Sequence, residues 1–205
     1  MEKKKDNRIM GNWKYRITHI PYLIRLWWFL KPFKKSHHST FLGENVRVSH
    51  PENVEIGENV QLCRDVELCV SACRSDSSEP PLLKIGNNVR IGEACRIGCS
   101  FEVIIEDNVL FAPNVHISDR DHNYSDITKP INEQPIITKG AVRIGEGSWL
   151  GLGCQIYSGV TIGKHCVVGG GSIVTHSVPD FCVVAGNPAR IIKRYNKETS
   201  LWEKV

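Results

Sequence analysis

A six-residue repeat constrains the fold of this chain more than any other feature. From Ile85 the sequence runs IGNNVR, IGEACR and IGCSFE, and after residue 143 it resumes as IGEGSW, LGLGCQ, IYSGVT, IGKHCV and VGGGSI. Every sixth residue is Ile, Leu or Val, usually followed by Gly. A period of six would scatter apolar residues around an α-helix, and it is not the alternation of a two-faced strand. It predicts short strands joined by tight turns that return each aliphatic residue to one interior line.

The repeat therefore predicts an all-β fold, a parallel β-solenoid whose coils bury their aliphatic residues by stacking on one another. Gly supplies the positive φ that the corners of such coils require. We expect three parts along the chain. These are a basic and aromatic N-terminal segment with a short helix (1–43), the solenoid (44–178) with an inserted loop (118–143), and a C-terminal tail (179–205).

Three of the eight cysteines follow the register of the repeat. Cys95, Cys154 and Cys166 each lie four residues after the aliphatic residue of their repeat, where other repeats carry Val or Ser. This spacing predicts small interior packing residues. The sequence has no C-x-x-C pair and no visible secretory signal, so eight thiols favour reduced cysteines in a cytoplasmic protein and no metal site.

The charge of the chain argues against nucleic acid as a partner. The formal net charge is +4, and part of it comes from basic residues near the two termini: Lys3, Lys4, Lys5, Lys193, Arg194, Lys197 and Lys204. The sequence has neither a long basic stripe nor an RNA-binding motif with interleaved aromatic residues. We therefore expect no nucleic-acid binding.

The most apolar segment, PYLIRLWWFLKP, lies near the N-terminus. It has about half of the roughly 20 residues that a membrane-spanning helix needs. It predicts a short amphipathic helix that starts at Pro21 and ends before Pro32. Packing over one end of the solenoid or on a neighbouring subunit is the favoured interpretation. The alternative is peripheral contact with the inner face of a membrane through Trp27, Trp28 and Phe29.

The repeat stops at Ser118 and resumes at Ile144, and the intervening segment begins SDRDHNYSD. Long insertions in a compact domain are usually functional. His122 lies at the root of this loop, close to a rigid scaffold, and an imidazole that titrates near neutral pH suits removal of a proton from a hydroxyl. A carboxylate on its other ring nitrogen would fix the tautomer. Asp119 and Asp121 are both near enough, and the sequence does not choose between them.

The repeats, the interruption around His122 and the closing GSIVTHSVPDFCVVAGNPARIIKRY together resemble the left-handed β-helix, hexapeptide-repeat acyltransferases, over about residues 44–195. Within that family the chain is most similar to the sugar O-acetyltransferases of the maltose, galactoside and lipopolysaccharide O-antigen type. The resemblance implies a left-handed coil, acetyl-CoA as co-substrate, and a homotrimer that binds it between adjacent solenoids. It also implies direct transfer to a sugar hydroxyl, with His122 as the general base.

The same resemblance places contacts to coenzyme A after the loop. Trp149, Gly151 and Leu152 match the stretch where the family packs pantetheine, although the aromatic side chain is also a candidate for a subunit contact. Gly170 and Thr175 match positions that offer backbone contacts to the same arm, where a residue without Cβ allows close approach.

Other matched positions depart from the family pattern. His176 stands where the galactoside enzymes have a lysine, and Arg190 and Lys193 match basic residues near the phosphates. Lys193 replaces an arginine and so loses the bidentate fork. On the acceptor side the candidates are Ser100, which replaces an aspartate, and Asn114. Because the sequence around Ser100 does not match, we expect an acceptor other than a simple galactoside.

Several alternatives stay open from the sequence. Within the same fold, the chain could be an N-acetyltransferase of an amino nucleotide sugar or an acetyltransferase of an antibiotic. A carbonic-anhydrase-like zinc enzyme needs three converging histidines, and only His116 and His122 lie near one another. A non-catalytic scaffold is the candidate from a different class. The interrupting segment 70–84 is either one wall of a larger acceptor site or a surface loop.

Overall fold

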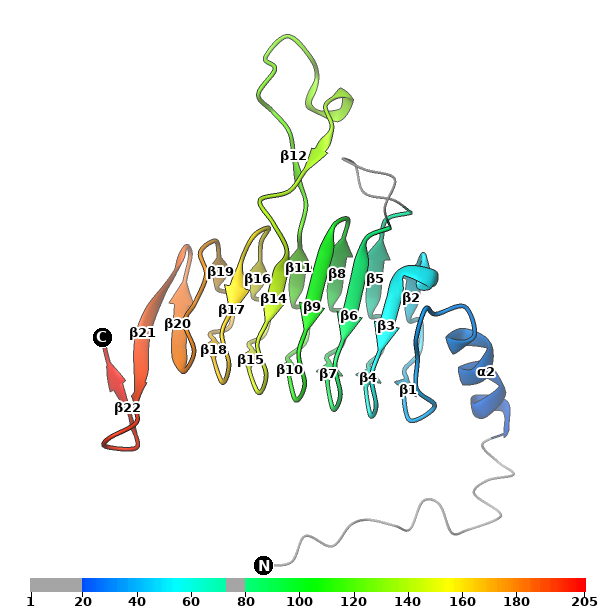
Figure 1. Cartoon of the computed structure of the whole chain (residues 1–205), viewed down its shortest axis with the longest axis horizontal. Coiled ribbons are helices and arrows are strands. Elements are labelled where there is room, and N and C mark those ends of the chain that lie inside the picture. The colour runs from blue at the N-terminus through cyan, green and yellow to red at the C-terminus, as the bar shows by residue number, and fades with distance from the viewer. Residues whose placement is uncertain (1–19, 73–79) are drawn as a thin grey trace, which may run out of the picture.

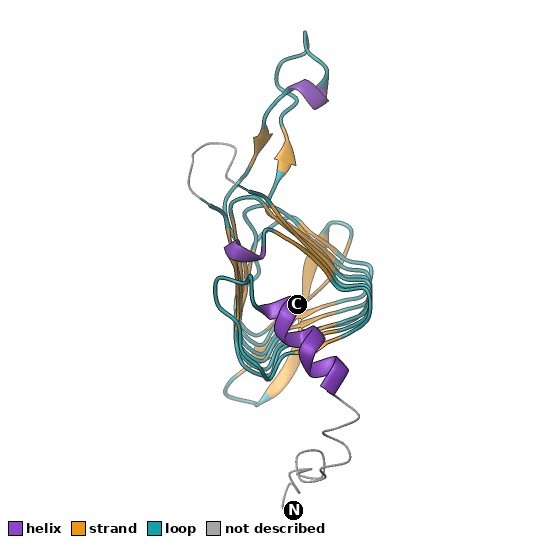
Figure 2. Cartoon of the chain, turned by 90° about the vertical axis from the view of Figure 1, so that its right-hand side faces the viewer, coloured by secondary structure: helices purple, strands orange, loops and turns teal. Residues whose placement is uncertain are grey.

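The computed structural model describes residues 20–72 and 80–205 and shows a three-sided parallel β-helix (Figures 1 and 2). Each coil contributes a strand to each of three parallel sheets in turn. The all-β solenoid predicted from the repeat is confirmed. Lys3, Lys4, Lys5 and the central part of the 70–84 segment lie outside the described residues.

The sheets differ in length along the solenoid. The six-stranded sheet contains β2 (Arg47–Ser49), β5 (Glu67–Val70), β8 (Arg96–Cys99), β11 (His116–Ser118), β16 (Gln155–Ile156) and β19 (Ile173–Val174). The five-stranded sheet contains β3 (Val54–Ile56), β6 (Leu82–Ile85), β9 (Glu102–Ile105), β14 (Val142–Ile144) and β17 (Thr161–Ile162). The nine-stranded sheet contains β1 (Phe41–Leu42), β4 (Gln61–Leu62), β7 (Arg90–Ile91), β10 (Leu110–Phe111), β15 (Trp149–Leu150), β18 (Val167–Val168), β20 (Cys182–Gly186), β21 (Ala189–Asn196) and β22 (Leu201–Lys204). The 3-10 turns η2 (Pro51–Asn53) and η3 (Ile131–Glu133) complete the coil and loop structure.

The aliphatic residues of the repeat form the core. In the five-stranded sheet they stand in register across five coils, and each is at most 1% exposed: Ile56, Ile85, Ile105, Ile144 and Ile162. Cys95, Cys154 and Cys166 are buried as well, so the prediction that they are interior packing residues is confirmed. Stacking therefore buries a continuous apolar line that no coil could bury alone.

Two of the three edges of the solenoid carry the candidate site residues. The turns that join the six-stranded to the five-stranded sheet form the loop edge, which includes residues 99–101, 119–141, 157–160 and 175–177. The turns that join the nine-stranded to the six-stranded sheet form the second edge, which includes 112–115, 151–154 and 169–172. The inserted loop projects from the loop edge, away from the solenoid (Figure 1).

The helix α2 (Ile20–Leu30) covers the N-terminal end of the solenoid (Figure 2). Leu26 and Leu30 are buried. The Tyr22 hydroxyl accepts a hydrogen bond from the Leu42 N–H (2.9 Å), and Arg25 Nη2 donates to the Leu42 carbonyl (3.0 Å). These side chains satisfy backbone groups of the end strand β1 that no further coil reaches. The favoured sequence interpretation, a short helix packed over one end, is thus confirmed.

The C-terminal tail extends the nine-stranded sheet at the opposite end, where β22 is the exposed edge strand. Residues Cys182–Gly186 continue the parallel nine-stranded sheet beside β18, and β21 and β22 then add to it antiparallel. Strands paired in parallel therefore run from Phe41 in β1 to Val184 in β20, which extends past residues 44 and 178. Within residues 20–72 and 80–205, no helix is long and apolar enough to span a membrane.

Candidate active site

The inserted loop is an ordered arm with two legs. β12 (Asp121–His122) pairs antiparallel with β13 (Ile136–Ile137), so that His122 lies opposite Ile136. At the tip, the Gln134 side chain bridges the arm. Its Nε2 donates to the Asp126 carbonyl (2.9 Å), and its Oε1 accepts from the Asp126 N–H (3.1 Å). The structure thus holds His122 in a short hairpin.

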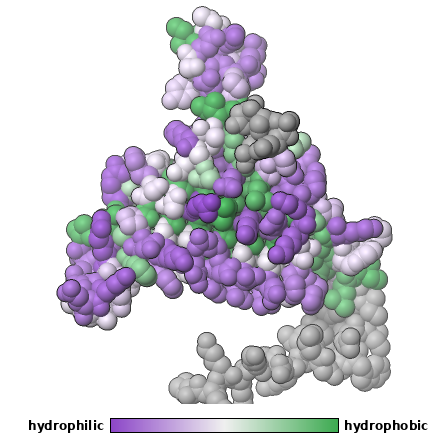
Figure 3. Space-filling model, in the orientation of Figure 1, coloured by the Kyte–Doolittle hydropathy of each residue, from purple (hydrophilic) through white to green (hydrophobic). Residues whose placement is uncertain are grey.

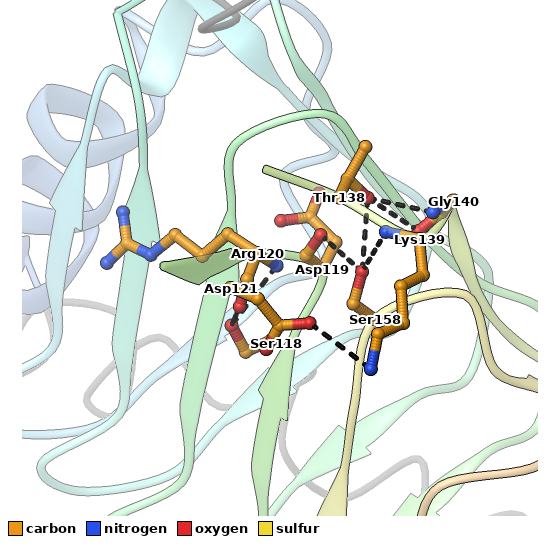
Figure 4. Close-up of polar contacts among 8 residues, drawn as sticks. All are labelled: Ser118, Asp119, Arg120, Asp121, Thr138, Lys139, Gly140 and Ser158. Atoms are coloured by element: carbon orange, nitrogen blue, oxygen red, sulfur yellow. Dashed lines mark hydrogen bonds and ion pairs between the residues drawn. The ribbon is translucent and has the colours of Figure 1, made fainter. Parts of the chain in front are cut away.

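A buried serine of the next coil fixes both legs to the solenoid (Figure 4). Ser158 Oγ donates to the Asp119 carbonyl at 3.0 Å and accepts from the Lys139 N–H at 2.7 Å. The hydroxyl of Thr138 lies 3.1 Å away. Sequence reasoning missed Ser158, because a serine inside a repeat looks like any other turn residue.

Asp119 holds the root of the arm on the preceding coil. It is fully buried, and its two carboxylate oxygens accept hydrogen bonds from the backbone N–H groups of Ser100 and Phe101, both at 2.8 Å. Burial raises the pKa of the Asp119 carboxyl, and the backbone N–H donors partly oppose that shift. Both oxygens bind backbone groups of the preceding coil, so this carboxylate holds the arm in place and does not point toward the ring of His122.

His122 itself is exposed on β12. Among the described residues, its ring has no hydrogen-bond or ion-pair partner. The neighbouring Asp121 carboxylate lies 3.8 Å from Lys139 Nζ, and successive strand residues point to opposite faces. The pairing of His122 with Asp119 or Asp121 expected from the sequence is therefore absent from the single chain, because each aspartate faces a different partner.

The two acceptor candidates lie on different edges. Ser100 is buried at the loop edge, where its hydroxyl lies 2.8 Å from Ser71 Oγ and accepts from Arg120 Nη1 at 3.3 Å. Asn114 lies on the second edge with φ 60°, a left-handed corner position. The structure brings Ser100 to the root of the arm, and it leaves Asn114 at another edge of the same chain.

Three of the candidates for pantetheine contact lie on the second edge. The Gly171 N–H donates to the Leu152 carbonyl at 2.7 Å, which sets Gly151 and Leu152 directly beside Gly170 in the next coil. A Cβ at Gly151 would lie 2.6 Å from the Val168 carbonyl oxygen, so coil stacking by itself requires glycine there.

The remaining candidates for coenzyme A contact are spread over the chain. Trp149 is half-exposed on the outer face of β15. Thr175 and His176 lie on the loop edge, where Thr175 Oγ1 and His176 Nδ1 are 3.0 Å apart. Arg190 and Lys193 lie on β21, beyond the last coil. One chain therefore does not bring these residues and His122 into one cleft.

Within the part of the chain that the structure describes, no three His, Cys, Asp or Glu side chains are grouped so as to hold a metal ion. His116 lies on the outer face of β11, and His122 lies on the arm.

The chain is similar in sequence to several known transferases. A family model described as bacterial transferase hexapeptide (six repeats) matches residues 141–176. Two Escherichia coli proteins are similar over most of their length. A galactoside O-acetyltransferase is 34% identical over 72% of this chain and 73% of its own length. WbbJ, whose name assigns it provisionally to lipopolysaccharide biosynthesis as an O-acetyl transferase, is 35% identical over 64% of this chain and 70% of its own length. The chain belongs to the hexapeptide-repeat acyltransferases.

Membership of this family makes the chain an acyltransferase and confirms the left-handed β-helix, and its acetyltransferase relatives indicate acetyl-CoA as the co-substrate. A Mycobacterium tuberculosis protein named "probable acetyltransferase" is 33% identical over 89% of this chain, and the chain spans 59% of that protein. Among solved structures, a maltose O-acetyltransferase from Clostridium difficile 630 matches with a TM-score of 0.52 at 25% identity, over 88% of both chains. The N-acyltransferase AntD from Bacillus cereus, in complex with dTDP and 3-hydroxybutyryl-CoA, shares the fold with a TM-score of 0.62 at 21% identity, over 82% of this chain and 87% of AntD.

Proposed function

We propose that this hexapeptide-repeat acyltransferase moves an acetyl group from acetyl-CoA to a sugar hydroxyl in the biosynthesis of a surface polysaccharide or lipopolysaccharide. The observation that carries the proposal is the anchored arm, which presents the exposed His122 beside the solenoid. The names of the two Escherichia coli relatives, both O-acetyl transferases, support a hydroxyl acceptor.

His122 acts as the general base. Its ring nitrogen takes the proton of the acceptor hydroxyl as that oxygen attacks the thioester carbonyl, and the imidazolium then returns the proton to the departing coenzyme A sulfur. One C–O bond forms, one C–S bond breaks, and no acyl-enzyme occurs. The buried thiols support direct transfer, since burial raises the pKa of Cys95 and Cys166 to about 11 and that of Cys154 to about 12.

A homotrimer completes the site in this proposal. Within one chain His122 is on the loop edge, and Gly151, Leu152 and Gly170 are on the second edge. If the second edge of one copy faces the loop edge of another, the acyl donor and the base meet between copies. Two large apolar side chains of the arm, Ile127 (96% exposed) and Tyr124 (75%), support a contact with another copy.

The outer face of α2 fits a membrane surface that carries anionic lipids. Leu23, Ile24, Trp27 and Trp28 are between 51% and 62% exposed there, and part of this hydrophobic end is visible on the right of Figure 3. Lys31 Nζ lies 5.3 and 5.4 Å from the centroids of the two indole rings. Apolar and aromatic side chains beside lysines are typical of helices that lie in a lipid interface. This contact would place the enzyme beside a lipid-linked acceptor.

The first test compares His122→Ala with wild type in coenzyme A release from acetyl-CoA, over a panel of sugars, nucleotide sugars and oligosaccharides, with mass spectrometry of the products. We expect acetyl-CoA binding to persist and turnover to fall by about a hundredfold or more. His38→Ala, which changes an exposed histidine far from the arm, should keep wild-type turnover. Near-normal turnover of His122→Ala would refute the general base.

The N-acetyltransferase alternative is decided in the same experiment. The likeness to AntD establishes the fold and leaves the acceptor open. A product whose acetyl group survives mild alkali is an amide and would favour transfer to an amine, whereas an ester product is cleaved and supports the proposed hydroxyl acceptor.

A further inference from the structure

The outer face of the six-stranded sheet carries a row of charged side chains beside the arm. Arg47, Glu67, Arg96 and His116 stand in register on successive strands. The Glu67 carboxylate lies between two guanidinium groups, 3.7 Å from Arg47 Nε and 3.3 Å from Arg96 Nε. The single carboxylate of Glu67 therefore pairs with two arginines.

Arg120 adds a further cation at the root of the arm. In Figure 4 its side chain extends away from the contacts between Asp119 and Ser158. It passes near Gly98, where an added Cβ would lie 3.9 Å from Arg120 Nε, and its Nη1 donates to Ser100 Oγ. Arg120 is half-buried, and no carboxylate among the described residues pairs with it.

Arg96 and Arg120 reach neighbouring positions on this face, because Arg96 Nε donates to Cys69 Sγ at 3.4 Å and Cys69 is in register with Gly98. Burial lowers the pKa of His116, and the positive charges of Arg96 and Arg120 lower it further. Among the described residues of this face, the three arginines exceed in charge the one carboxylate that pairs with two of them, Glu67. The hydroxyls of Ser71 and Ser100 lie 2.8 Å apart at the same edge. Guanidinium forks combined with hydroxyl donors are the groups that bind phosphate oxygens.

We propose that Arg120, together with Arg96 and Ser71, binds a phosphate or diphosphate group of the acceptor, so that the acceptor is a phosphorylated sugar. Ser100 orients the guanidinium of Arg120. This inference rests on the proposed function and names the class of its acceptor. Because Arg120 is two residues from His122, an anion held there leaves the attached sugar within reach of the base.

The position of the patch separates it from the expected site of the acyl donor. The candidates for coenzyme A contact lie on coils after the arm, from Trp149 to Lys193, whereas Arg96 and Ser71 lie on coils before it. The diphosphate of a nucleotide sugar and that of a lipid-linked sugar have the same chemistry, so the two sources are distinguished by experiment.

The direct test is calorimetric binding of inorganic pyrophosphate to the full chain saturated with coenzyme A, so that sites for the phosphates of coenzyme A are filled. We expect wild type to bind pyrophosphate and Arg120→Gln to bind it about tenfold or more weakly, with partial recovery in Arg120→Lys. Arg64→Gln is the matched control, because Arg64 is exposed and paired with Glu93 on the second edge. Equal binding by wild type and Arg120→Gln, or no binding by wild type, would overturn the proposal.

Kinetics provide a second readout. N-acetylglucosamine, UDP-N-acetylglucosamine and prenyl-diphosphate-linked N-acetylglucosamine present one sugar in three forms. We expect Arg120→Gln to raise KM for a diphosphate form about tenfold while KM for acetyl-CoA is unchanged. A preference for the nucleotide or the lipid form supports the proposal and identifies the source. Equal use of the neutral sugar would overturn the phosphate site and leave the acetyltransferase function standing. If no acetyl transfer occurs with any acceptor, the proposed function fails, and pyrophosphate binding still tests the phosphate site.

Discussion

At the scale of the residue, the hydroxyl of Ser158 joins the arm to the solenoid. Ser158→Ala removes the acceptor for the Lys139 N–H and the donor to the Asp119 carbonyl. Leaving both groups unsatisfied should lower the free energy of unfolding by about 1–3 kcal/mol. It should also speed hydrogen exchange in residues 119–140 and slow acetyl transfer. Urea unfolding, exchange mass spectrometry and turnover measure the three effects.

Ser148→Ala provides the matched control. Ser148 is also buried and makes two comparable hydrogen bonds, to the Gly163 carbonyl (2.8 Å) and from the Cys166 N–H (3.0 Å), at a corner that carries no arm. It should cost similar stability without changing exchange in the arm. If both variants alter exchange in the arm equally, the specific role of Ser158 is wrong.

The residues that the sequence predicted well are those that obey the repeat. The register alone identified the interior aliphatic residues and the buried Cys95 and Cys154, because a fixed period puts equivalent positions in equivalent places. Ser158 and Arg120 could not be found in this way. Their partners, Asp119 and Ser100, belong to other coils, and only the fold brings them together.

At the scale of the element, α2 can be tested apart from the acetyl-transfer chemistry. The double variant Trp27→Ser/Trp28→Ser removes two half-exposed aromatic side chains from its outer face. We expect co-sedimentation with vesicles of phosphatidylglycerol and phosphatidylcholine to weaken by about tenfold or more. Pure phosphatidylcholine vesicles should bind wild type less well, because the anionic lipid is absent.

Trp202→Ser is the control for this experiment, since Trp202 is partly exposed on β22 at the other end of the solenoid. Unchanged vesicle binding by the double variant would contradict a lipid contact. If that variant instead dissociates into single copies, the outer face of α2 covers a neighbouring subunit.

The helix and the loop could be predicted from the sequence because nearby residues mark where each begins or ends. Pro21 in the first turn of α2 and Pro32 just after it predicted the approximate limits of the helix, and the interruption of the repeat located the arm. The hairpin inside the arm and the continuation of the sheet through β20 were not predicted. Both depend on backbone pairing between segments without a repeated side-chain pattern.

At the scale of the whole molecule, the state of association is the property to measure. Leu110 and Trp149 are paired in register on the nine-stranded sheet, and both are more than 40% exposed. We expect sedimentation equilibrium to give three times the chain mass of 23.1 kDa. Leu110→Asp should weaken association, because it places a charge on an apolar contact.

Thr161→Asp puts the same charge on the outer face of the five-stranded sheet and should leave association unchanged. A wild-type mass equal to that of one chain would show that the homotrimer is wrong. His122 and the second edge would then need another way to meet.

The covered N-terminal end of the solenoid also limits how copies can stack into fibres. A bare end strand offers its N–H and C=O groups to any other strand, and stacked coils already have the inter-strand spacing of cross-β fibrils. Here the side chains of Tyr22 and Arg25 occupy the free N–H and C=O of Leu42. The 11-residue helix α2 thus blocks the pairing of another strand with Leu42 at this end. We expect proteolytic removal of that helix to leave these two groups of Leu42 open to a strand of another copy, and so to favour end-to-end stacking.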